Sequence, residues 1–229
     1  MSPLKAIIQV LFPTTCAACG RVLVEGERQV CIGCLADMAA TAYSKMPGNG
    51  TERLLFGRIH LETGTSIYYF KADNTVRRIV HAMKFHGNTE LCRMMGRQMG
   101  LELLRSGRFD DVDVLVPVPL HWIRRLQRGY NQSELLCRGI ADVMPREVNT
   151  TALVRKRHTK QQSRQSGQRR ADNVADAFST KRPDELTGRH VLLVDDVLTT
   201  GATLCACADA LATVPGIKIS VATFSVAAG

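Results

Sequence analysis

From residue 66 onward, short apolar runs alternate with stretches of helical periodicity. The apolar runs have strand length and lie at 66–71, 112–118, 190–194 and 217–226. Apolar positions at helical spacing predict helices over 74–85, 90–105 and 132–143, and a further helix that begins near residue 201. Strands that alternate with helices build a parallel or mostly parallel sheet. The pattern therefore predicts an α/β domain.

Residues 1–64 lack this alternation. Residues 2–12 contain a short apolar stretch with only Lys5 before it and no small-residue cleavage site, so we expect a docking helix rather than a signal peptide. The expected compartment is a reducing cytoplasm. The turn-rich run Pro47–Gly50 indicates a linker. We expect three parts: an N-terminal helix with a cysteine module at 1–46, a linker at 47–64 and the α/β domain at 65–229. No apolar run approaches the roughly 20 residues of a membrane helix.

Four of the eight cysteines form two Cys-x-x-Cys pairs separated by eleven residues: Cys16, Cys19, Cys31 and Cys34. Each pair can bring two thiolates to one metal ion, and two pairs complete a tetrahedral sulfur site that suits Zn²⁺. Because four protein ligands leave no open position, we expect one structural Zn²⁺ in a double-zinc-ribbon-like module. An iron–sulfur cluster, two disulfides and a redox pair remain the alternatives.

The net charge of +9 is concentrated in one part of the chain. Residues 121–182 contain 14 Lys and Arg against 5 Asp and Glu, which accounts for the whole excess. Such a patch attracts polyanions, either phosphorylated metabolites or nucleic acid, although a solvated basic surface is the simpler interpretation. Within it, residues 155–170 have almost no apolar side chain and predict an exposed loop or arm that folds over a ligand.

The most specific motif follows the strand at 190–194, where two carboxylates precede a Thr- and Gly-rich turn and a helix start. Free N–H groups and the dipole at a helix N-terminus hold phosphate, and carboxylates accept hydrogen bonds from hydroxyls. A ligand with hydroxyls on one side and a phosphate on the other is a ribose 5-phosphate. The candidate residues are Asp195, Asp196, Thr199, Thr200, Gly201, Ala202 and Thr203.

This stretch, residues 191–204, is very similar to the signature of type I phosphoribosyltransferases. The resemblance implies a Rossmann-like fold with a mostly parallel sheet, in which the paired acids engage the ribose 2′ and 3′ hydroxyls and the loop holds the 5′-phosphate. It also implies phosphoribosyl pyrophosphate as the ligand, with Mg²⁺ bridging ribose and pyrophosphate.

Three further segments narrow the resemblance. They are 116–132, which contains Val-Pro-Val-Pro-Leu-His and Arg-Gly-Tyr-Asn-Gln, 153–178 with its spaced Arg, Gln and Asn residues, and His81-x-Met83-Lys84-Phe85-His86-Gly87. Together with the cysteine pairs and the phosphate loop, these segments resemble the ComF family, bacterial proteins linked to uptake or utilisation of external DNA during natural competence. The resemblance extends from Cys16 to about Ala222.

The ComF resemblance implies roles for two groups of residues. A pyrophosphate loop and the polar residues beyond it would comprise Pro117, Val118, Pro119, Leu120, Arg124, Arg128 and Asn131. A flexible arm that contacts single-stranded DNA together with the zinc module would include Arg155, Lys156, Arg157, Lys160, Arg164, Arg169 and Arg170.

Three functions are compatible with these features. The first is a DNA uptake and utilisation protein that binds phosphoribosyl pyrophosphate, or a related ribose phosphate, and single-stranded DNA. The second is an active phosphoribosyltransferase with an unknown acceptor, and the third is a sensor that binds without chemistry. The first implies a competence helicase or an inner-membrane channel as a partner, and a cytoplasmic location that includes the periphery of the inner membrane. The sequence does not show an acceptor-base pocket that would decide between them.

Overall fold

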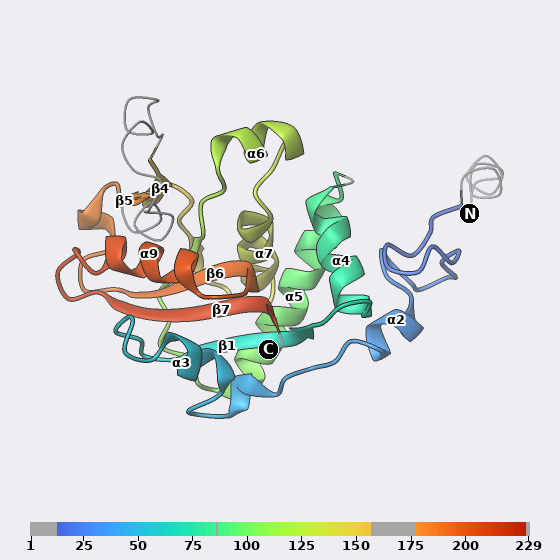
Figure 1. Ribbon diagram of the computed structural model, residues 1–229, viewed down its shortest axis with the longest axis horizontal. Helices are drawn as coiled ribbons and strands as arrows, with labels where there is room; N and C mark the ends of the chain where they lie inside the picture. Colours follow the sequence, from blue (N-terminus) through green and yellow to red (C-terminus); the bar gives the residue numbers. More distant parts are fainter. Residues whose placement is uncertain (1–12, 86, 157–176, 228–229) are drawn as a thin grey trace, which may run out of the picture.

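The core of the molecule is a parallel five-stranded sheet with the strand order β1-β7-β6-β2-β3 (Figure 1). We describe residues 13–85, 87–156 and 177–227 of a computed structural model. The strands are β1 (Gly64–Phe70), β2 (Val114–Pro117), β3 (Glu147–Val148), β6 (His190–Leu198) and β7 (Lys218–Ala227). The predicted α/β class with a mostly parallel sheet is confirmed, since every pair in this sheet is parallel.

The strand register brings the ends of the central strands together. Pro117 of β2 pairs with Val194 of β6, and Asp195 pairs with Thr223 of β7. The four buried apolar residues that precede Asp195 form the middle of the sheet. Parallel strands share one carboxyl edge, so the segments that follow β2 and β6 emerge side by side.

Helices cover both faces of the sheet (Figure 1). Side chains of α4, α5 and α7 pack in one core with sheet residues such as Leu192 and Phe224. On the other face, α9 and Leu55 of α3 pack in a second core with Val191 and Val221. The helices are α3 (Gly50–Leu55), α4 (Thr75–Lys84), α5 (Thr89–Ser106), α7 (Gln132–Ala141) and α9 (Ala202–Leu211).

Helices α5 and α7 approach so closely that only glycine fits at their contact. A Cβ atom at Gly139 would lie 2.1 Å from the carbonyl oxygen of Arg93. The same contact positions the N-terminus of α7, which faces the carboxyl edge.

The cysteine module lies against α4 and the edge strand β1. It contains α2 (Ile32–Ala36) and two isolated antiparallel bridges, and it is followed by the short 3-10 helix η1 (Tyr43–Lys45). Asn88 donates to the side chain of Gln29 at 2.8 Å, and Thr41 N–H donates to the Ile67 carbonyl at 2.9 Å. The module therefore shares the core of the larger domain instead of standing apart from it.

Several elements were not evident from the sequence. The predicted linker at 47–64 contains α3, and the basic stretch before Gly129 forms a helix, α6 (Trp122–Arg128), that projects above the sheet (Figure 1). The antiparallel pair β4 (Leu153–Arg155) and β5 (Phe178–Thr180) flanks residues 157–176, and η3 (Pro183–Glu185) precedes β6. The predicted helix in 1–12 and most of the predicted arm lie outside the described residues.

Candidate functional site

Two adjacent carboxylates lie near the carboxyl end of β6, and each contacts a side chain from a helix, one from α7 and the other from α4. Asp195 accepts hydrogen bonds from Ser133 Oγ at 3.0 Å and from the Asp196 N–H at 2.9 Å. Lys84, the last residue of α4, lies with its Nζ 2.9 Å from Asp196 Oδ2. Neither partner was among the predicted site residues. Lys84 belongs to the His81–Gly87 motif, which could have indicated it, whereas no local signal points to Ser133.

The pKa of the Asp195 carboxyl is raised into the neutral range, so its protonated and its ionised forms are both populated near pH 7. Burial and the negative charge of Asp196 raise its pKa to about 7, although the hydrogen bonds from Asp196 and Ser133 and the charge of Lys84 act in the opposite direction. Desolvation is the largest cause of the raised pKa, because the Asp195 carboxyl packs against the start of α7, where Ser133 lies. A carboxyl with this pKa can exchange a proton at physiological pH.

This pKa predicts how Asp195 affects stability. The folded state retains the proton to about pH 7, whereas the unfolded chain releases it near its ordinary value of 3.8. Between these values the folded state binds more protons, so the contribution of Asp195 to stability falls as the pH rises. We expect Asp195→Asn to stabilise the protein near pH 8 by on the order of 1–3 kcal/mol and to have little effect near pH 4. Urea denaturation at both pH values measures this, and an equal effect at both would contradict it.

The phosphate loop follows β6 and opens into α9. Thr199 and Thr200 are exposed, and Gly201 has a positive φ of 78° at the helix start without a side-chain cap. The Ala202 N–H lies 3.4 Å from Thr200 Oγ1, and Thr203 is in the first turn. The first N–H groups of a helix have no partner within it. The loop therefore presents backbone donors and threonine hydroxyls on one surface.

The segment predicted as a linker supports this loop. Arg58 Nη1 donates to the Thr200 carbonyl at 2.5 Å. A Cβ atom at Gly201 would lie 2.9 Å from Leu55 Cδ2, so the loop backbone packs directly on α3. These contacts could not be predicted from the sequence, because a turn-rich segment far from the loop carries no information about what it packs against.

The predicted pyrophosphate loop lies beside the carboxylates. After β2, the Val118 N–H donates to the Val194 carbonyl at 2.9 Å. Asn131 is buried, caps α7 and donates from Nδ2 to the Val118 carbonyl at 3.0 Å, so its amide holds this turn in position. Pro119 and Leu120 continue from the turn toward α6.

A hollow of about 390 Å³ opens next to these residues, between α6 and the end of α4. Three cations line it: Lys84, Arg124 and Arg128. Burial lowers the pKa of Arg128, while the negative charge of Asp196 raises it, which indicates that the hollow adjoins the carboxylate pair. Although Lys84 is paired with Asp196, the three cations together suit a phosphorylated ligand.

Two residues of the predicted arm are described. The Arg155 guanidinium lies 5.3 Å from the centre of the Phe178 ring, and its buried Nε has no hydrogen-bond partner among the described residues. Lys156 is exposed. The remaining predicted arm residues lie outside the described part of the chain: Arg157, Lys160, Arg164, Arg169 and Arg170.

The four predicted metal ligands come together. The Sγ atoms of Cys16, Cys19, Cys31 and Cys34 all lie within 4.8 Å of one another. The N–H of Cys31 donates to Cys16 Sγ at 3.3 Å, and the N–H of Cys34 donates to Cys31 Sγ at 3.4 Å. The Cys34 N–H is the main cause that lowers the pKa of Cys31 to about 6, which favours the thiolate form that binds metals.

The cluster has the dimensions of a four-sulfur metal site. Ligands at a zinc–sulfur distance of about 2.3 Å lie about 3.8 Å apart in a tetrahedron. The Sγ atoms of Cys19 and Cys31 are 3.8 Å apart. None of the eight cysteines, all of which lie within the described residues, forms a disulfide. The four cysteines are therefore positioned to hold a metal ion.

Comparison with known proteins identifies the domain and its relatives. A model of the phosphoribosyl transferase domain matches residues 132–226. DNA utilization protein YhgH of Escherichia coli K12 is 35% identical over 136 residues, which is 58% of this chain and 59% of the relative. Competence protein F of Haemophilus influenzae is 32% identical over 130 residues, 55% of this chain and 57% of the relative. Competence protein ComFC of Bacillus subtilis is 28% identical over 144 residues, 63% of this chain and 55% of the relative.

The matches thus span less than two thirds of the length of these relatives. A solved glutamine phosphoribosylpyrophosphate amidotransferase from B. subtilis, complexed with ADP and GMP, is similar over 57% of this chain and 25% of its own, with 17% identity and a TM-score of 0.39, too low to support any argument. In the described residues no helix combines the length and the hydropathy of a membrane span. The predicted resemblance is confirmed: over more than half of its length the chain is similar to competence and DNA-utilisation proteins, and residues 132–226 match the phosphoribosyl transferase domain.

Proposed function

We propose that this protein acts in DNA uptake or utilisation and binds phosphoribosyl pyrophosphate, or a related ribose phosphate, at the carboxyl edge of its sheet. The observation that carries the proposal is the arrangement of Asp195 and Asp196 between two anion-binding features. On one side is the threonine loop that opens into α9. On the other is the hollow lined by Lys84, Arg124 and Arg128. The names and domain match of the relatives support the same role.

Each part of this edge has a chemical role in the proposal. The carboxylates accept hydrogen bonds from ribose hydroxyls, and the N–H groups and hydroxyls of residues 199–203 donate to the 5′-phosphate. Arg124 and Arg128 neutralise the diphosphate beside the turn of residues 117–120. Asp195 and Asp196 supply oxygen ligands of the kind that Mg²⁺ prefers, and Mg²⁺ bound with the ligand would reduce the charge on the diphosphate.

We further propose that the cysteine cluster holds one structural Zn²⁺, since four soft sulfur ligands leave no open coordination position. In the proposed role, the arm that begins at Arg155 and Lys156 contacts single-stranded DNA. A competence helicase or an inner-membrane channel is the protein partner of this role. In this role the protein would act at the cytoplasmic side of the inner membrane. Its proposed parts are an N-terminal helix with the cysteine module at 1–46, a linker at 47–64 and the α/β domain at 65–229.

A second candidate is phosphoribosyl transfer to an unknown acceptor. The raised pKa of Asp195, about 7, favours it, because a carboxyl that exchanges protons at neutral pH can act as an acid or a base. The cations of the hollow would stabilise the charge that develops on a departing pyrophosphate.

Calorimetric titration of the zinc-loaded protein with phosphoribosyl pyrophosphate and Mg²⁺ tests the proposal. We expect saturable binding that weakens about tenfold or more in the Arg124→Gln/Arg128→Gln double variant, because two charge-assisted contacts are lost. Arg105→Gln/Arg138→Gln is the matched control, since both arginines are exposed in pairs within their own helices. Absence of binding to the unaltered protein would sink the ribose-phosphate assignment.

A further inference from the structure

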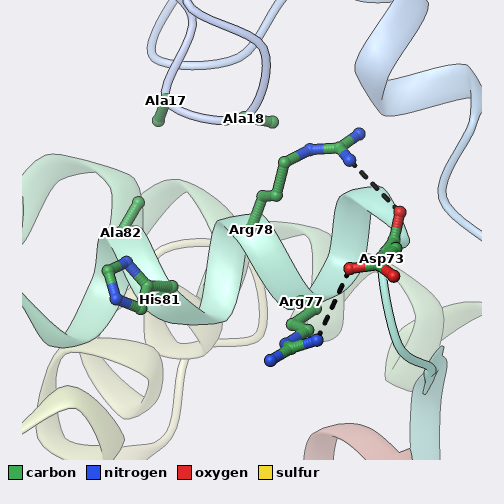
Figure 2. A pocket seen from close by; sticks show the side chains of 7 residues that line it. All are labelled: Ala17, Ala18, Asp73, Arg77, Arg78, His81 and Ala82. Carbon is green, nitrogen blue, oxygen red and sulfur yellow. Dashed lines mark hydrogen bonds and ion pairs between the residues drawn. The ribbon is translucent and has the colours of Figure 1, made fainter.

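A hollow separates the cysteine module from α4, on the far side of α4 from the sheet edge described above. It has a volume of about 360 Å³ (Figure 2). Ala17 and Ala18 of the first cysteine turn line one wall, and the α4 side chains of Arg77, Arg78 and His81 line the other. The module and the helix therefore form the two sides of a groove whose α4 wall is basic.

Planar side chains connect this hollow to the one beside the carboxylates. The rings of His81 and Phe85, one helical turn apart, have centroids 4.6 Å apart and planes tilted by 36°. Phe85 is 53% exposed, and the Arg128 guanidinium lies 5.5 Å from the centre of its ring. His81 lines the first hollow and Phe85 the second, so the contact between their rings lies between the two hollows along α4.

The charge along this path is positive. The cations that line the two hollows are Arg77, Arg78, Lys84, Arg124 and Arg128, and among the described residues Asp73 is the one acid that lines either of them. Arg77 Nη1 lies 3.6 Å from Asp73 Oδ1, but the Arg77 side chain is 54% exposed and that of Asp73 96% exposed. Exposed pairs of this kind are weak, so Arg77 remains available to a stronger anion.

We propose that this path along α4, which we call the α4 track, binds single-stranded DNA and leads it to the carboxylate edge. Positive side chains that follow a backbone and planar groups on which bases stack are the two features of a single-strand site. The ten residues of α4, Thr75–Lys84, span about 15 Å, enough for a few nucleotides. The inference rests on the proposed role in DNA handling and deepens it by assigning the strand to a surface outside the predicted arm.

The test measures DNA affinity by fluorescence anisotropy. The probe is a labelled oligothymidylate of about 12 nucleotides, within the usual site sizes of about 4–16. The double variant Arg77→Gln/His81→Ala removes one charge and one planar group from the α4 track, in the zinc-loaded full chain. The matched control, Arg105→Gln/His60→Ala, makes the same chemical change at exposed residues away from α4.

We expect the track variant to bind the oligonucleotide about tenfold more weakly, and the slope of log affinity against log salt to fall by about 0.7 for the lost charge. The control retains the affinity and slope of the unaltered protein. Equal affinities and slopes for the two double variants would overturn the track, and so would absence of binding by the unaltered protein.

Calorimetry with phosphoribosyl pyrophosphate on the same proteins separates this result from the proposed function. Loss of DNA affinity with unchanged binding of the small ligand supports the part of the α4 track at Arg77 and His81 as a surface distinct from the small-ligand site. If the unaltered protein does not bind the small ligand, but the track variant binds DNA more weakly than the unaltered protein does, the ribose-phosphate site is refuted and the α4 track is still supported.

Discussion

The Asp195→Asn/Asp196→Asn double variant is expected to lose binding of phosphoribosyl pyrophosphate by at least about a hundredfold. Each substitution replaces a carboxyl group that would accept hydrogen bonds from ribose hydroxyls, and a hydrogen bond to a charged group contributes about 1.5–3 kcal/mol. The amides keep the shape of the carboxyls, so Ser133 and Lys84 retain a polar neighbour in place of an empty space. Calorimetric titration in the presence of Mg²⁺ measures the loss.

The control for this variant is Asp110→Asn/Asp184→Asn, which makes the same change in charge at two exposed aspartates. It should bind like the unaltered protein. Near-equal affinity of the two double variants would remove the carboxylate pair from the ligand site. Circular dichroism of both variants checks that the fold is intact, and a cooperative melt at an unchanged or higher temperature is expected for the site variant.

Cys34→Ser is expected to abolish stable zinc binding and to unfold the cysteine module. The module has few apolar residues of its own, and the apparent binding free energy of a structural zinc site is about 10–16 kcal/mol, most of it coupled to folding. Atomic emission should find one zinc per chain in the unaltered protein and close to none in the variant. Limited proteolysis should then cut within residues 13–46, which the folded module protects.

Cys205→Ser serves as the matched control, because Cys205 is a buried thiol outside the cluster. It should keep one zinc per chain. A Cys34→Ser protein with full zinc content would contradict the four-cysteine assignment. Iron and labile sulfide in place of zinc would favour the iron–sulfur alternative.

Some features followed from local sequence alone. The run from His190 to Val194 is apolar because both faces of a central parallel strand are buried, and it forms the first half of β6. The two Cys-x-x-Cys turns also need only local geometry and one joining contact, and their four Sγ atoms meet as the spacing predicts. The helix start after Gly201 was readable for the same reason, since the loop conformation is encoded within a few residues.

The end of β6 and helix α6 differ from the sequence prediction, and each difference has a physical reason. The strand at 190–194 extends to Leu198, because Asp195, Val197 and Leu198 still pair with β7 through their backbones. Pairing with a neighbouring strand depends on that neighbour and not on the polarity of the side chain. Helix α6 has seven residues and none of them is buried, and a segment this short contains too few apolar positions to show a helical period.

The sequence by itself determined the main strands and helices of the α/β domain, the phosphate loop and the cysteine cluster, because each of these depends on residues close together in the chain. Only the tertiary structure decided what surrounds the carboxylates. Ser133 lies 62 residues from Asp195 in the chain, and Arg58 lies 142 residues from Thr200, yet both form hydrogen bonds at the site. Such partners are set by how helices pack on the two faces of the sheet and by the shared edge of parallel strands. A periodic pattern of apolar residues specifies which side of each element is buried, but not which polar side chain meets it across the fold.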